Sequence, residues 1–329
     1  MAEASDHQPI RVQRLVDRPI IGPDAHPSIG ANIQGPSLIR VPDWVVEPLG
    51  RYYLYFADHK GRYIRLAHAD ALTGPWRIHV PGSLRLEQTP FPNDPPPVSA
   101  EAVRRAEARN RERGVRIGHS VAREMGTPHI ASPDVHVHDA DRQIVMYYHG
   151  LEAAGRQVSR VAVSHNGVDF ESHTDILGRT YMRVFEYRRV TYALAMPGQF
   201  YRSRNPLHGF EEGPLLFNPD MRHAAVLVRG DTLYVFWTQV GQAPERILLS
   251  TVSLLGDWIN WQASEPVEVL RPERSWEGAD APLEPSYRSV AYGEVNQLRD
   301  PAIYVERDAI YLLYAVAGES GIAIARIWL

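Results

Sequence analysis

Apolar and aromatic residues gather in short runs that recur along the chain, and each run is followed by a turn and a further strand-like run. Five of the runs have nearly the same composition, built around Tyr or Trp, at residues 52–56, 144–148, 190–194, 233–237 and 310–314. Aromatic and β-branched residues favour strands. A second strand candidate follows each run after a short polar loop, at residues 63–69, 160–165, 200–204, 247–252 and 322–327. The pattern predicts an all-β chain made of one repeated unit.

Four of the units continue into a glycine followed by an aromatic residue, such as Gly74-Pro75-Trp76, which would lead into an outer fourth strand. The fifth unit stops at Leu329 after three strands, and residues 10–16 offer an unpaired strand. If that segment completes the last unit, the ring closes and leaves no bare edge. We therefore predict a closed five-bladed β-propeller that forms a single domain over residues 1–329. The blades are expected at about residues 35–80, 129–175, 180–217, 222–270 and 299–329 plus 10–16.

Two segments interrupt the repeat, at residues 81–128 and 271–298. The first lies between blades one and two and contains a predicted helix, because Ser99 can cap it, Ala, Arg and Glu favour it, and Gly114 ends it. Long loops on a rigid scaffold commonly form the walls of a binding site. Surface loops without a role are the alternative.

Composition narrows the class of protein. The 329 residues include no Cys, which excludes disulfides, thiolate metal sites and cysteine nucleophiles. The net charge is -4 without a basic run, which argues against a nucleic-acid partner. Residues 1–9 do not resemble an export signal, and no apolar run approaches the length of a membrane span. We expect a soluble, cytoplasmic protein without a membrane partner, as a monomer or a dimer.

In a propeller, the innermost strand of each blade starts beside the axis, and the loop between the second and third strands returns to the same face. Polar side chains at these places therefore converge. The candidates for ligand binding are Asn32, Gln34, Asp58, His59, His149, Arg183, Arg222 and Arg299. The candidates for acid/base chemistry are Asp134, Glu152, His223 and Asp300.

A family resemblance appears in the same units. The stretch Gly50-Arg51-Tyr52-Tyr53-Leu54-Tyr55-Phe56-Ala57-Asp58, followed by Gly74-Pro75-Trp76, resembles the five-bladed glycosidases of glycoside hydrolase family 43 and its relatives. The resemblance spans the whole chain and implies a catalytic Asp opening blade one, an Asp opening blade three and a Glu opening blade four. At these places the sequence has Gly35, Thr180 or Tyr181, and Arg222-His223. The catalytic triad of the family is therefore not carried over.

Other carboxylates are available for the same chemistry. Inverting hydrolysis needs a protonated acid and an ionised base roughly 6.5–9.5 Å apart. Asp300 and Asp134 open blades five and two and could face each other across the axis, while Glu152, Asp58 and Glu319 lie on loops that could reach in. The alternative for Asp300 and Asp134 is a structural role, in which the carboxylate accepts backbone N–H bonds in a turn.

Arg183, Arg222 and Arg299 stand at or near the starts of three inner strands. Guanidinium groups make forked hydrogen bonds to carboxylate or phosphate. They could hold an anionic sugar, or phosphate as in the mannoside phosphorylases of glycoside hydrolase family 130, or each could pair with a neighbouring acid, such as Arg299 with Asp300.

His223 is the axial member of a group of 14 histidines, most of which we interpret as structural. It could act as an acid/base, bind a sugar hydroxyl, or be bridged by water to the Ca²⁺ that some family 43 relatives hold at the axis. No metal-ligand motif is present and no cofactor is required. Trp276 lies outside the repeat and is a candidate for stacking on a sugar face.

These observations favour an enzyme that hydrolyses a small, possibly anionic oligosaccharide or glycoside by acid/base catalysis at the axis. The alternatives are a phosphate-dependent glycoside phosphorylase and a non-catalytic carbohydrate-binding propeller. The missing triad fits a binding protein, whereas the crowd of ionisable residues at one end of the blades favours an enzyme.

Overall fold

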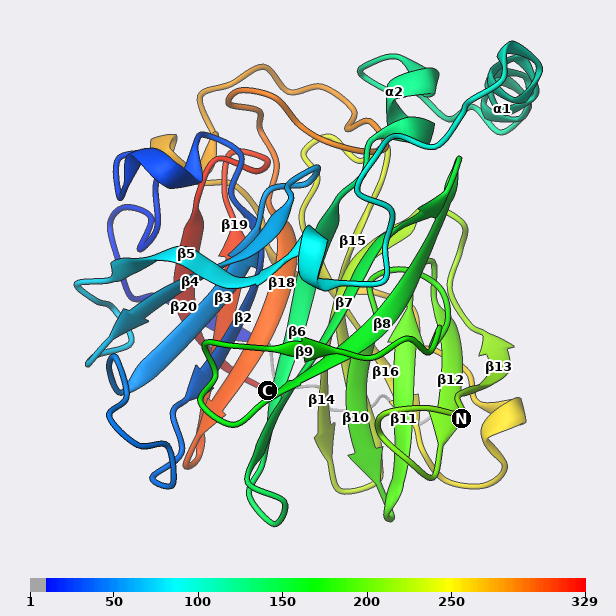
Figure 1. Cartoon of the computed structure of the whole chain (residues 1–329). Helices are drawn as coiled ribbons and strands as arrows, with labels where there is room; N and C mark the ends of the chain where they lie inside the picture. The colour runs from blue at the N-terminus through cyan, green and yellow to red at the C-terminus, as the bar shows by residue number, and fades with distance from the viewer. Residues whose placement is uncertain (1–9) are drawn as a thin grey trace, which may run out of the picture.

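The computed structural model describes residues 10–329, in which five four-stranded antiparallel sheets are arranged as the blades of a ring (Figure 1). The predicted five-bladed β-propeller is confirmed. Residues 1–9, on which the expectation of no export signal rested, lie outside the described residues. Within residues 10–329, no helix has both the length and the apolar composition needed to cross a membrane.

Each blade is a meander in which the strand nearest the axis comes first. Blade one comprises β2 (Gln34–Arg40), β3 (Tyr52–Ala57), β4 (Tyr63–Ala69) and β5 (Arg77–Arg85). Blade two comprises β6 (Ile130–His138), β7 (Gln143–Ala153), β8 (Arg156–Ser164) and β9 (Glu171–Ser172). Blade three comprises β10 (Arg183–Tyr187), β11 (Val190–Ala195), β12 (Gln199–Ser203) and β13 (Glu211–Leu215). Blade four comprises β14 (Met221–Arg229), β15 (Thr232–Gln239), β16 (Ile247–Ser253) and β17 (Val267–Leu270).

Blade five joins the two ends of the described chain. Its strands β18 (Arg299–Glu306), β19 (Ala309–Ala315) and β20 (Ile322–Trp328) are completed by β1 (Arg11–Arg14), which pairs antiparallel with β20. The Arg14 side chain then reaches the buried carboxylate of Glu277 at 2.7 Å. The ring is therefore closed by the N-terminal strand, as predicted.

The apolar core consists of five layers, one between each pair of neighbouring blades. Tyr53 and Tyr55 of blade one pack with Tyr148 of blade two in one layer, and equivalent clusters fill the other four interfaces. Each sheet thus packs apolar side chains on both of its faces. The second strands are therefore aromatic and apolar almost throughout, without an alternation of apolar and polar residues. The layers fix the blades relative to one another and so position the strand ends at the axis.

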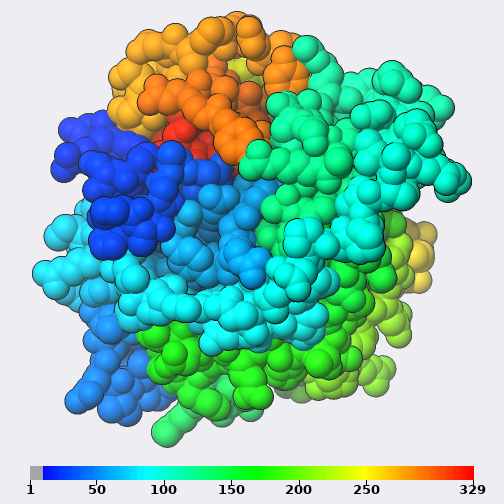
Figure 2. Space-filling view, turned by 45° about the horizontal axis from the view of Figure 1, so that its top comes forward, coloured from blue at the N-terminus to red at the C-terminus, as the bar shows by residue number. Residues whose placement is uncertain are grey.

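The insertion between β5 and β6 carries two helices, α1 (Ala100–Glu112) and α2 (Val121–Gly126). Ser99 caps α1 through a hydrogen bond from the Ala102 N–H, as its position predicted. Single-turn 3-10 helices occur at η1 (Pro27–Ile29), η2 (Leu86–Gln88), η3 (Trp258–Asn260) and η4 (Ser275–Glu277). Figure 2 shows the insertion, in cyan and teal, meeting the orange segment 271–298 over one end of the ring. A backbone hydrogen bond from Arg288 to Arg116 joins these two segments.

Candidate active site at the propeller axis

Each blade brings one residue in the left-handed backbone conformation to the start of its inner strand. These residues are Gly35, Ser132, Tyr181, His223 and Asp300, with φ of 64°, 53°, 60°, 51° and 48°. In four blades the strand register shifts at this point, so that the chain bulges where the inner strand begins. Non-glycine residues adopt this conformation rarely, and they cluster at functional sites. The repetition of one strained geometry marks this end of the ring as the candidate site.

Gly35 explains why blade one lacks an axial side chain. A Cβ atom at this position would lie 3.1 Å from the Cα of Ser132 in blade two. That spacing is tighter than ordinary van der Waals contact, and the φ of 64° disfavours a larger residue as well. A carboxylate at this place, which the family resemblance would imply, would require the Ser132 backbone to shift by a few tenths of an ångström.

A cavity of about 360 Å³ opens at the axis. Its walls come from blades one to four, from the insertion and from the segment that precedes blade five. Among the side chains that line it are Gln34, His59, Glu124, Ser132, His149, Tyr181, Arg222, His223 and Ser289. The volume lies near the lower end of the range for small-molecule sites, so the cavity suits a small ligand rather than a long polymer.

Asp300 is next to Tyr181 and His223, which line this cavity, and its pKa is shifted upward. Its side chain is 1% exposed, accepts a 2.7 Å hydrogen bond from the Tyr181 hydroxyl at Oδ1, and has no partner at Oδ2. Burial, reinforced by the negative charge of Glu319, raises the pKa of Asp300 to about 6. The Tyr181 hydrogen bond and the Arg299 charge oppose this shift. A carboxyl group that holds its proton close to neutral pH can act as a general acid.

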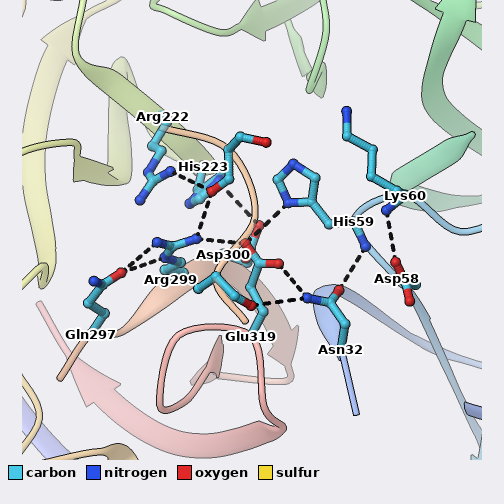
Figure 3. Close-up of polar contacts among 12 residues, drawn as sticks. Asn32, Asp58, His59, Lys60, Arg222, His223, Gln297, Arg299, Asp300 and Glu319 are labelled. Carbon is cyan, nitrogen blue, oxygen red and sulfur yellow. Dashed lines mark hydrogen bonds and ion pairs between the residues drawn. The ribbon is translucent and has the colours of Figure 1, made fainter. Parts of the chain in front are cut away.

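Glu319 shows the opposite behaviour in the same network (Figure 3). It accepts hydrogen bonds from Arg299 Nη1 at 2.7 Å, Asn32 Nδ2 at 2.7 Å and His59 Nδ1 at 3.1 Å. Burial disfavours its charge, but His59, Arg299 and Asn32 outweigh that cost and lower the pKa of Glu319 to about 2. Glu319 therefore stays ionised, and its charge helps Asp300 to keep a proton. Asn32 and His59, both predicted from sequence, act here as partners of Glu319.

The three axial arginines are occupied by protein groups. Arg222 forms a doubly hydrogen-bonded ion pair with the buried Glu245, and Arg299 binds Glu319 and the Gln297 side chain. Arg183 donates to carbonyl oxygens of blades two, three and four, although its Nη2 has no partner. These contacts remove the observation that suggested an anionic ligand or phosphate. The pairing partner of Arg299 is Glu319 rather than Asp300.

His223 and His149 border the cavity as neutral rings. Burial, followed by the charges of Arg222 and Arg299, holds the pKa of His223 well below its ordinary value. Its Nδ1 lies 3.3 Å from Thr238 Oγ1, and its Nε2 lies 3.9 Å from Asp300 Oδ1. Burial likewise lowers the pKa of His149, whose Nδ1 has no partner. Neutral imidazoles suit hydrogen bonding to a ligand rather than proton donation.

Three predicted carboxylates do not line the cavity. Asp134 accepts from the Val184 N–H and from His136, and so ties blade two to blade three. Glu152 pairs with Arg160 at 2.7 Å, and Asp58 accepts from the Lys60 N–H at 2.8 Å (Figure 3). Hydrogen bonds within the scaffold account for all three, so Asp134 does not face Asp300 as the sequence suggested.

Trp276 lies in η4, away from the axial cavity. It packs against the core layer between blades four and five. With Trp76 it lines a separate groove of about 1220 Å³, which the segment from Arg14 to Ala25 borders. This groove is larger than the axial cavity, but it contains none of the axial residues, so its size does not make it the catalytic site.

Glu124 lines the cavity although the sequence did not indicate it. It lies on α2 and accepts hydrogen bonds from Lys60 Nζ at 2.9 Å and Ser289 Oγ at 2.6 Å, with His119 Nε2 2.8 Å away. Burial opposes its charge, but Lys60 and His59 overcome that effect and lower its pKa. Because the insertion is not repeated and carries no strand pattern, neither feature that placed the other axial residues applied to Glu124.

The axial residues do not form a cation site. Among residues 10–329, no group of three or more His, Asp or Glu side chains is arranged to hold a metal ion. His223 faces Thr238 and Asp300, and arginines surround it. A calcium ion bridged to His223 by water therefore does not fit these residues.

Comparison with known protein sequences identifies a relative of the chain. No protein-family model matches the chain. The chain is 33% identical over 322 residues to the uncharacterized protein R118 of Acanthamoeba polyphaga mimivirus, covering 90% of this chain and 83% of that protein.

Solved structures give a consistent picture of the architecture. A family-43 β-xylosidase/α-arabinofuranosidase from a compost microbial metagenome, in complex with xylotriose, has a TM-score of 0.55 at 11% identity and covers 97% of this chain and 94% of that one. An α-L-arabinofuranosidase from Lactobacillus brevis has a TM-score of 0.55 at 13% identity, with 89% and 90% covered. An α-L-arabinanase from Cellvibrio cellulosa, complexed with arabinohexaose, has a TM-score of 0.50 at 12% identity, with 89% and 90% covered. The chain therefore has the fold of family-43 glycoside hydrolases.

Proposed function

The chain belongs to the same family as protein R118 of Acanthamoeba polyphaga mimivirus, and from its axial site we propose that it is a glycoside hydrolase. It would cleave a glycosidic bond by general acid/base catalysis, with Asp300 as the proton donor. The observation that carries the proposal is the state of Asp300, whose burial beside the ionised Glu319 raises its pKa to about 6. A structural carboxylate gains more from being ionised and fully hydrogen-bonded, whereas Asp300 Oδ2 has no partner.

The surroundings of Asp300 suit proton transfer. The Tyr181 hydroxyl orients the carboxyl group, and both Tyr181 and His223 line the cavity and approach Asp300. The pKa of about 6 keeps a useful fraction of Asp300 protonated near neutral pH, and solvent returns a proton to its carboxylate after each turnover.

A short neutral sugar is the substrate class that fits the cavity best. Arg222 and Arg299 are paired with the carboxylates of Glu245 and Glu319, so neither offers an unpaired charge for an acidic sugar, and Arg183 is engaged by backbone carbonyl groups. Gln34, Ser132 and His149 line the cavity with neutral amide, hydroxyl and imidazole groups. Arabino- and xylo-oligosaccharides are the first compounds to test, since arabinohexaose and xylotriose are bound by two of the similar structures.

The experiment compares the wild type with Asp300→Asn on para-nitrophenyl glycosides of arabinofuranose, xylose and galactose and on the corresponding oligosaccharides. Loss of proton donation should lower turnover about a hundredfold or more. Calorimetry of the same oligosaccharides should give an unchanged dissociation constant, because asparagine preserves the shape of the side chain. Glu152→Gln is the matched control, since that carboxylate pairs with Arg160 outside the cavity.

Two results would overturn the proposal. A wild-type protein that binds an oligosaccharide but cleaves none of the panel would be a carbohydrate-binding propeller. Full activity in Asp300→Asn would mean that another group donates the proton.

A further inference from the structure

The insertion places a carboxylate in the axial cavity that none of the five blades supplies. We propose that Glu124 is the general base of this site and that α2 holds the attacking water against the axis. This inference rests on the proposed hydrolysis and adds its second catalytic group. Blade one cannot provide that group, since Gly35 carries no side chain and Ser132 crowds its position.

Three segments hold the Glu124 carboxylate in place. Lys60 from the β3–β4 loop donates to Oε1 at 2.9 Å, and Ser289 from the segment before blade five donates to Oε2 at 2.6 Å. His119, from the insertion itself, lies 2.8 Å from Oε2. A group fixed from several sides loses little entropy when it orients a water molecule.

The backbone around α2 is fixed as well. The carbonyl of Met125 accepts a hydrogen bond of 2.8 Å from Gly155 in the β7–β8 loop. On the other side, the Arg116 carbonyl accepts one of 2.9 Å from Arg288, and Ile117 forms a bridge with the same residue. The short helix is thus attached to blade two and to the segment before blade five, which keeps Glu124 at the wall of the cavity.

The charges around the two carboxyl groups favour opposite protonation states. Glu124 faces Lys60 and the His59 ring, and in Figure 3 this ring lies between Lys60 and Asp300. Asp300 faces the ionised Glu319 and is buried more completely. Glu124 is therefore the ionised partner, and Asp300 is the one that keeps its proton up to a pH of about 6, which is the pairing that acid/base hydrolysis needs.

Ser289 contacts both Glu124 and Arg299. Its hydroxyl binds Glu124, whereas its carbonyl oxygen accepts from Arg299 at 3.1 Å, next to Asp300 in the chain. Within residues 10–329 no hydrogen bond joins the acid and the base directly, so the two carboxyl groups are separate. Direct attack by water requires such a separation, roughly 6.5–9.5 Å, and inverts the anomeric centre.

The step balances without any further reactant. Water forms a bond to the anomeric carbon while Glu124 takes one of its protons. The glycosidic C–O bond breaks as Asp300 gives its proton to the leaving oxygen. The products are a sugar with inverted configuration and the released alcohol, and the proton on Glu124 returns to Asp300 through solvent.

The test uses Glu124→Ala and Glu124→Gln with dinitrophenyl arabinofuranoside and xyloside, whose leaving groups need no protonation. Both variants should lose about a hundredfold or more in kcat on these substrates, while Asp300→Asn should retain most of its activity on them. Sodium azide should restore turnover to Glu124→Ala by replacing the activated water, and the product should be a glycosyl azide of inverted configuration. Thermal unfolding checks that each variant folds.

Lys60→Met distinguishes a catalytic role of Glu124 from a purely structural one. This variant removes the ion pair that attaches the insertion but leaves the Glu124 carboxylate in place. If Glu124 only holds α2 in place, Lys60→Met and Glu124→Gln should lose equal amounts of activity, and azide should rescue neither Glu124 variant. That result would overturn the assignment of Glu124 as the base, while the proposed hydrolysis by the wild type would still stand. If the wild type cleaves no member of the panel, the proposed hydrolysis itself fails. A retained configuration in the product would also exclude Glu124 as the base.

Discussion

Replacing Asp300 by asparagine should stabilise the protein at neutral pH while it removes the proposed acid. Asp300 has a pKa of about 6 in the folded chain against an ordinary value of 3.8. Between these values the folded chain binds more protons than the unfolded chain, so the free energy of unfolding falls as the pH rises. Asparagine does not titrate, and it tolerates the left-handed backbone at this position, where φ is 48°.

The structure sets the size of the effect. The shift from 3.8 to about 6 is about 2 pKa units, and each unit corresponds to about 1.4 kcal/mol. Asp300 is 1% exposed, so solvent screening does not reduce this value appreciably. The wild type should therefore lose about 3 kcal/mol between pH 3 and pH 7 from this one group, and Asp300→Asn should not.

Urea denaturation at a series of pH values measures the difference directly. Any constant cost of the asparagine NH₂ cancels, because the prediction concerns the change of the difference with pH. Asp141→Asn, an exposed carboxylate in the β6–β7 turn, is the control. A stability difference between wild type and Asp300→Asn that stays constant across this range would refute the argument that burial holds a proton on Asp300.

Three further outcomes are expected. The value of kcat/KM should fall as the pH rises above about 6. In Tyr181→Phe this fall should occur at higher pH, because the tyrosine hydrogen bond favours the ionised form of Asp300. An unshifted profile in this variant would contradict the prediction. Calorimetry should find that neutral arabino- and xylo-oligosaccharides bind more tightly than uronic-acid or phosphorylated ones, and a tenfold preference for the acidic ligands would count against it. Glu277→Ala should lower the free energy of unfolding by roughly 3 kcal/mol, because it leaves Arg14 and a buried tyrosine hydroxyl without their acceptor. Glu273→Ala, which removes the exposed partner of the same arginine, should cost less than about 1 kcal/mol.

The fold could be predicted because every blade repeats the same local sequence pattern. An aromatic second strand such as Tyr52–Ala57 meets neighbouring blades on both faces, and this is visible in composition. The last unit has three strands, and residues 10–16 offer one more, so the ring was expected to close by their pairing. The pairing of β1 with β20 closes it in this way. Topology of this kind depends on the order of short segments and needs no side-chain directions.

The site was only partly predictable, because side-chain direction depends on the bulges. Counting to the start of each inner strand placed His223 and Asp300 correctly at the axis. Asp134 stands two residues after the bulged Ser132, where the shifted register turns its carboxylate toward Val184 instead. Glu124 comes from an insertion without periodicity, so only the folded chain brings it to Lys60 and Ser289.

The sharing of blade five between β1 and the last three strands has a consequence for assembly during synthesis. The four residues from Arg11 are synthesised long before the strand that ends at Trp328 and must wait for it before they find their partner. Until then blade five lacks its outer strand, and the interface between blades four and five lacks the contacts of Val12. A nascent chain that stops short of β20 would thus hold several finished blades but no closed ring, so blade five would be completed only when β20 pairs with β1.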